Sequence, residues 1–185
     1  MKLEISPIGK GNDDTSHDRL SVLRDAHCTL IALADGVNSG AAAQTAAART
    51  VNELARCFRN GTLSHDPRDW VMVLEAIDAV VFSDPDAGET NALVILVQQE
   101  IVVGASVGNS LAYIVTPAGE AELLTKHQRR GPHMGTGLAR PVGFGPVQLD
   151  GRLITRRASR FHMEDGPATI GARRASGASA SLAGC

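Results

Sequence analysis

The sequence predicts an α+β fold in which helices are segregated to one face of an antiparallel sheet. Three observations predict it: a short apolar run that stops at an Asp-Gly pair, two following segments with helical periodicity, and then several short apolar runs separated by tight turns. The chain has 185 residues and a hydrophobic content of 43%, which fits one domain with a real core. Because aromatic content is only 3%, Val, Leu, Ile and Ala must build that core.

The first elements precede the helices. Lys2 to Ile8 alternates weakly and predicts an edge strand, and the polar stretch from Gly9 to Asp18 predicts a loop. Cys28 to Ala34 is an apolar run that ends at Asp35-Gly36. It therefore predicts a buried strand that runs into a tight turn.

Two helices are expected next. The Ala-rich segment from Gly40 to Arg59 places its larger apolar side chains on one helical face. In the second segment, Asp66 offers an N-cap and Pro67 a first-turn proline. Asp84-Pro85-Asp86 ends the apolar stripe, so the second helix is expected to end there.

Four short strands are expected after the helices, at Asn91 to Val97, Ile101 to Val107, Leu111 to Thr116 and Ala121 to Leu124. The links between them are short enough for antiparallel neighbours, which predicts a meander. Gly131 to Gly145 is rich in Gly and Pro and predicts a loop.

The amino-acid composition of the chain changes after Asp150. The following segment is rich in arginine, and residues 171–185 are almost all Ala, Gly, Ser and Arg, without apolar periodicity. We therefore predict a folded domain over residues 1–150 and a divergent, disordered tail over residues 151–185.

Composition excludes several classes of function. The net charge of −2 gives no sign of a nucleic-acid or membrane partner. Cys28, Cys57 and Cys185 are widely spaced and match no zinc pattern, so free thiols are expected. The start of the chain shows no signal peptide, and no apolar run approaches the length of a membrane span. These features predict a cytoplasmic protein.

Carboxylates at two places suggest a site for hard metal ions. Asp13 and Asp14 lie side by side in the predicted Gly/Asn loop, and Asp35 ends the apolar strand beside Gly36. Taken singly, neither signal is specific. Acidic pairs in loops are usually solvated, and Asp-Gly after a strand is usually a simple turn.

Four ordered segments give these carboxylates a context. Gly11-Asn12-Asp13-Asp14 resembles an Asn-Glu-Asp segment, and Leu33-Ala34-Asp35-Gly36-Val37 resembles a strand-ending Asp-Gly motif. Gly88-Glu89-Thr90-Asn91-Ala92 resembles a Gly-Ser-Thr-Ala strand start, and Val107-Gly108-Asn109-Ser110-Leu111 resembles a Gly-Asp-Ser hairpin. In this order the segments resemble the metal-dependent protein phosphatases of type 2C, over roughly residues 5–125.

The resemblance implies a fold, a reaction and roles for particular residues. It implies an αββα sandwich, incomplete at its C-terminal end, that hydrolyses phosphoserine and phosphothreonine with two Mn²⁺ or Mg²⁺ ions. Asp35 would bridge the two ions, the carbonyl of Gly36 would bind one of them, and Asp14, with Asp13 beside it, would hold water at the metals. The implied partner is a phosphoprotein substrate, including a Ser/Thr kinase or its target.

Several positions depart from the family pattern. Asn109 stands where the family has an aspartate of a further metal site, so it would ligate without charge. Lys10 stands near the place of a phosphate-gripping arginine and would act as a point charge. Asp165 is at a plausible distance for a later metal aspartate, but no Asp or Glu follows it. A non-catalytic phosphatase-like domain that binds a phosphoprotein or a kinase is therefore the alternative.

Overall fold

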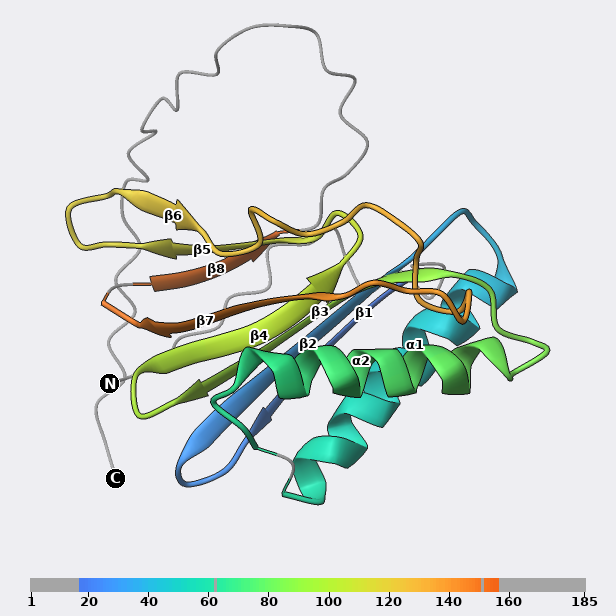
Figure 1. The fold of residues 1–185 in the computed structure, drawn as a ribbon, viewed down its shortest axis with the longest axis horizontal. Coiled ribbons are helices and arrows are strands. Elements are labelled where there is room, and N and C mark those ends of the chain that lie inside the picture. The colour runs from blue at the N-terminus through green and yellow to red at the C-terminus, as the bar shows by residue number, and fades with distance from the viewer. Residues whose placement is uncertain (1–16, 62, 151, 157–185) are drawn as a thin grey trace, which may run out of the picture.

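The structure, a computed structural model, describes residues 17–61, 63–150 and 152–156. Within these ranges two antiparallel sheets lie one above the other, and two helices cover the outer face of the larger sheet (Figure 1). The predicted α+β class, with both helices on one sheet face, is confirmed. The strand expected at Lys2 to Ile8 and the disorder expected beyond residue 156 lie outside the described residues.

The larger sheet has five strands in the order β1-β2-β3-β4-β7. Its strands are β1 (Asp18–Arg24), β2 (Cys28–Gly36), β3 (Thr90–Gln98), β4 (Ile101–Val107) and β7 (Val142–Gln148). Every neighbouring pair is antiparallel. β2 and β3 are the longest strands and lie inside the sheet, where both of their faces are covered.

The smaller sheet has the order β6-β5-β8, from β6 (Ala121–Leu123), β5 (Leu111–Val115) and β8 (Arg152–Arg156). The helices are α1 (Ala41–Arg59) and α2 (Pro67–Phe82). The Asp66 carboxylate accepts a hydrogen bond from the backbone N–H of Arg68 at 2.8 Å. The N-cap and the first-turn proline expected for α2 are thereby confirmed.

Strand alternation divides the core into two layers. On the helix side, Leu30, Ala32 and Ala34 of β2 pack with α1 and α2 around the buried Trp70. Side chains that point the other way, among them Ile31 of β2 and Leu93 and Ile95 of β3, pack against the smaller sheet. The polar side chains discussed below belong to this second face, at its end.

Four sequence-based expectations need correction. β1 had been placed partly in a loop and was not expected, because its charged residues obscure the alternation of Leu20 and Val22. β7 begins inside the loop predicted for Gly131 to Gly145 and continues beyond it, as an edge strand that tolerates Pro146. β4 and β5 do not pair, because the link at Gly108 to Ser110 carries the chain from one sheet to the other.

The fourth correction concerns the domain boundary. β8 lies beyond residue 150, within the segment assigned to the tail, and pairs with β5 from Leu111↔Arg156 to Val115↔Arg152. Its arginines concealed a strand in which Leu153 packs against the inter-sheet core. The domain therefore extends at least to residue 156.

One buried carboxylate holds the Gly-rich segment before β7. Asp78 of α2 is 3% exposed and accepts hydrogen bonds from the backbone N–H groups of Gly135, Gly137 and Ala139, at 2.6, 3.3 and 2.9 Å. Just before these residues, Met134 forms an isolated bridge with Thr90 at the start of β3. The segment is thus tied to both the helix layer and the sheet. Among the described residues, no helix is long and apolar enough to cross a membrane.

Candidate metal centre at the strand ends

Asp35 is the penultimate residue of β2, and it is 5% exposed. It shares its strand face with Ile31 and Leu33, so it points into the space between the two sheets. A carboxylate that is buried at the end of a central strand is held rigidly. The structure therefore keeps the sequence-predicted residue Asp35 at a position suited to binding a cation.

Asp18 lies directly opposite Asp35 in the pairing of β1 with β2. Residues that face each other across an antiparallel pair share a sheet face, with Cβ atoms roughly 5 Å apart. Two opposed carboxylates repel each other unless a cation or a proton lies nearby. Asp18 was not expected as a site residue because β1 was not expected, although the tight turn between Arg24 and Cys28 determines which residue faces Asp35.

Asn91 lies opposite Asp35 on its other side, in the pairing of β2 with β3. Its side chain is 5% exposed, and its Oδ1 atom has no hydrogen-bond partner among the described residues. Gly108 follows β4 directly, beyond the Ala92↔Val107 pair. We call Asp18, Asp35, Asn91 and Gly108 the strand-end row.

Glycine is required at both ends of this arrangement. A Cβ atom on Gly36 would lie 2.8 Å from the carbonyl oxygen of Ala43, so the first turn of α1 approaches β2 only because residue 36 lacks a side chain. A Cβ atom on Gly108, whose φ is 103°, would lie 2.0 Å from Oδ1 of Asn91. The Asn91 amide therefore occupies the space that a side chain at residue 108 would fill.

The other predicted site residues have different outcomes. Asn109 lies next to Gly108, at the same end of the sheet. Asp13, Asp14, Lys10 and Asp165 lie outside the described residues, so their roles stay predictions. Within the described ranges, no group of three or more His, Cys, Asp and Glu side chains is placed to hold a metal ion.

The donor set of the strand-end row fits a hard divalent cation. Asp18 and Asp35 offer carboxylate oxygens and Asn91 offers an amide oxygen, which are the ligand types that Mg²⁺ and Mn²⁺ prefer. Oδ1 of Asn91 is a buried acceptor without a hydrogen-bond partner among the described residues, as an oxygen ligand of a cation would be. The described residues thus fit part of a metal centre, and the rest of its ligands would have to come from elsewhere in the chain.

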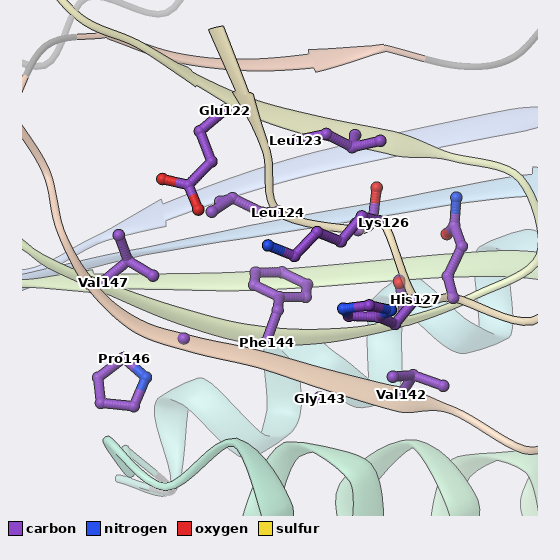
Figure 2. A pocket seen from close by; sticks show the side chains of 14 residues that line it. Glu122, Leu123, Leu124, Lys126, His127, Val142, Gly143, Phe144, Pro146 and Val147 are labelled. Carbon is purple, nitrogen blue, oxygen red and sulfur yellow. The ribbon is translucent and has the colours of Figure 1, made fainter.

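A cavity of about 260 Å³ lies between β7 and the segment that runs from Glu122 in β6 to Gln128. Figure 2 shows Lys126, His127 and Phe144 around this hollow. Ser106, two residues before Gly108 on β4, contributes a buried hydroxyl to its lining. No residue of the strand-end row is among the residues that line this cavity.

Comparisons with known proteins agree with the fold. A scan against protein-family models and a search of curated protein sequences found no match. Among solved structures, a bacterial serine phosphatase carrying a point mutation aligns with a TM-score of 0.61 at 23% identity, over 71% of this chain and 64% of that one.

Two further structures are similar. The serine/threonine phosphatase Stp1 from Staphylococcus aureus aligns with a TM-score of 0.54 at 19% identity, over 85% of this chain and 74% of that one. RsbX in complex with magnesium aligns with a TM-score of 0.53 at 15% identity, over 76% of this chain and 65% of that one. The chain thus spans about two thirds of the length of several such structures. The resemblance in the sequence motifs is confirmed at the level of architecture, and the chain has the fold of the bacterial serine phosphatases of type 2C.

Proposed function

We propose that this protein is a metal-dependent phosphatase that hydrolyses phosphoserine and phosphothreonine in a phosphoprotein substrate. The observation that carries the proposal is the buried Asp35 at the end of a central strand, with Asp18 opposite it, in a fold shared with serine phosphatases. Water would add to phosphorus and the ester P–O bond would break, giving inorganic phosphate and a free hydroxyl group. The alignment of RsbX, whose structure holds magnesium, supports a divalent cation as the cofactor.

The residues at the strand ends would have different roles in binding the metal ions. Asp35 and Asp18 would hold Mn²⁺ or Mg²⁺ through their carboxylates, and the carbonyl of Gly36 would supply a further oxygen. A bound pair of such ions supplies an acidified water and positive charge opposite the phosphoryl oxygens. Pairing with Thr90 and the hydrogen bond from the Gly36 N–H to the carbonyl of His17, at 3.1 Å, would hold that part of the backbone in place.

Residues outside the described ranges would complete the centre. We propose Asp13, Asp14 and Asp165 as further contributors of carboxylate oxygen, and Lys10 as a phosphate contact. The position of Asp18 sharpens this proposal. It already supplies the carboxylate that faces Asp35, so Asp14 would act in addition to Asp18 and not in its place.

A second candidate is a non-catalytic domain that binds a phosphoprotein or a kinase. The observation in its favour is the amide of Asn109 at a position where an aspartate is expected, together with the sparse set of ligating side chains in the described part of the chain. Such a domain would bind without turnover.

Hydrolysis of p-nitrophenyl phosphate by the full chain separates the two candidates. The phosphatase proposal expects hydrolysis that requires millimolar Mn²⁺ or Mg²⁺, is abolished by EDTA and is lost in Asp35→Asn. Millimolar Mn²⁺ saturates even weak sites. A folded protein that shows no hydrolysis at Mn²⁺ concentrations up to about 10 mM would therefore support the non-catalytic binding domain.

A further inference from the structure

The amide of Asn91 is a buried polar group whose oxygen has no partner among the described residues. It lies at the start of β3, 5% exposed, between Asp35 on β2 and Gly108 after β4. Its Oδ1 atom accepts no hydrogen bond from any described residue. A buried acceptor without a donor costs free energy, so its retention points to a group that binds there.

The neighbours of Asn91 restrict what that group can be. The residue directly opposite is Asp35, whose carboxylate accepts hydrogen bonds when ionised. On the next strand Asp18 again offers a carboxylate. A group that satisfies Oδ1 of Asn91 must be a cation or a hydrogen-bond donor, and the two carboxylates in the row favour a cation. An anion such as phosphate would bring further acceptors to the same place and would not satisfy Oδ1.

Local packing keeps the amide in position. Oδ1 lies against the backbone of Gly108, and any side chain there would displace it. The next residues of β3 on the same face are Leu93 and Ile95, which are fully buried among apolar neighbours. Along β3, the Asn91 side chain therefore borders the apolar core between the two sheets.

We propose that Asn91 is an additional, neutral oxygen ligand of the divalent cation held by Asp35, either directly or through one water molecule of that cation. This inference rests on the proposed function only for the presence of the metal, and not for turnover. It assigns a role to a residue that the motif resemblance leaves without one.

Binding of Mn²⁺ to the full chain, measured by isothermal titration calorimetry, tests the proposal. Asn91→Leu keeps the approximate volume and removes the oxygen, and we expect roughly ten-fold weaker Mn²⁺ binding. The matched control is Ser106→Ala. Ser106 carries a buried hydroxyl oxygen that also lacks a partner among the described residues, but it lies further along β4, opposite Leu93. This control is expected to bind Mn²⁺ like the wild type.

Asn91→Asp is a second variant, and it is expected to strengthen the effect of Mn²⁺ where Asn91→Leu weakens it. It adds a third carboxylate to the row, so repulsion should lower the melting temperature without metal, and Mn²⁺ should raise it by more than in the wild type. If Asn91→Leu does not fold, this pair of melting temperatures decides. Equal Mn²⁺ affinity in wild type and Asn91→Leu, or an unchanged metal-induced shift in Asn91→Asp, would overturn the proposal.

The two proposals fail in different ways. A wild-type protein that binds Mn²⁺ and depends on Asn91 for it, but hydrolyses no phosphoester, would remove the phosphatase proposal and leave the Asn91 ligand in place. Hydrolysis that requires Mn²⁺, combined with affinity that is independent of Asn91, would do the reverse. A wild-type protein that binds no Mn²⁺ would overturn both.

Discussion

The two ends of the five-stranded sheet differ in whether their polar side chains have hydrogen-bond partners among the described residues. At the end where β1 turns into β2, the Asp25 carboxylate accepts hydrogen bonds from the backbone N–H groups of His27 and Cys28, at 2.7 and 2.8 Å, and from the Cys28 thiol at 3.2 Å. At the other end, Asn91 keeps a buried oxygen without a donor in the described part of the chain. A polar group that shapes a turn is satisfied within the chain, whereas one left unsatisfied is available to a ligand.

The helix layer is tied to the end of the sheet that carries the strand-end row. The carboxylate of Asp78 fixes the segment from Gly135 to Ala139, and Met134 pairs with Thr90 in both directions, with N–H to carbonyl distances of 3.0 Å. Thr90 in turn lies opposite Gly36. A continuous set of backbone contacts therefore runs from α2 to the candidate metal centre, which would hold its ligands in fixed positions.

The largest expected effect is at the row itself. Asp35→Asn removes the buried charge and keeps the volume, so Mn²⁺-dependent hydrolysis should fall by at least about 100-fold, more than the loss typical of an indirect metal contact. Steady-state rates at saturating Mn²⁺ measure it. The control is Asp25→Asn at the opposite end of the sheet, which should retain the wild-type rate. Equal rates in wild type and Asp35→Asn would contradict the account.

The next effect is on stability. Asp78→Ala leaves three backbone N–H groups without their acceptor, and we expect the free energy of unfolding to fall by about 2 kcal/mol. Urea denaturation followed by far-UV circular dichroism measures it. Glu75→Ala, an exposed position on the same helix, is the control and should change stability little. A stability loss no larger than that of the control would show that the segment is held by other contacts.

A smaller effect concerns the pH dependence at the turn. The backbone N–H of His27, followed by that of Cys28, lowers the pKa of Asp25 below its usual value of 3.8. Because the folded-state pKa is the lower one, the stabilisation is present above about pH 4 and is lost as the pH falls through the folded pKa. The difference in urea midpoint between wild type and Asp25→Asn should therefore shrink below pH 4. A difference that is constant from pH 7 to pH 2 would rule out this role for the carboxylate.

The smallest effect is chemical reactivity at the same turn. Burial, followed by the hydrogen bond to Asp25, raises the pKa of the Cys28 thiol to about 11. Iodoacetamide should therefore modify Cys28 very slowly at pH 8 and faster as the pH approaches 11. Site-resolved mass spectrometry follows the reaction, and Asp25→Asn should speed it. Rapid modification of wild-type Cys28 at pH 8 would contradict this description of the turn.

Local signals predicted much of this fold. The cap at Asp66 and Pro67 predicted the start of α2, and the apolar run after Cys28 predicted a buried strand that ends at Asp35. Both signals depend on neighbouring residues only, so the sequence carries them directly. The free state of Cys28 and Cys57, expected from their spacing, is confirmed as well.

The remaining features depend on contacts between distant residues. β7 reads as a loop because Gly143, Gly145 and Pro146 are poor strand formers, and only pairing with β4 makes it a strand. Asp18 and Asn91 are candidate site residues only because of the strand register, which places each of them opposite Asp35. Periodicity along one strand cannot supply that relation.

The central claim is that a divalent cation binds at one end of the sheet and not at the other. Mn²⁺ is paramagnetic, so the broadening of backbone amide resonances in a ¹⁵N-labelled full-length sample locates it directly. β2 has nine residues, which separates its ends by about 30 Å. We predict that substoichiometric Mn²⁺ broadens the resonances of Asp35, Asn91 and Gly108 first and leaves those of Asp25 to Cys28 sharp. Broadening centred on the turn between β1 and β2, or none at the strand-end row, would contradict the account.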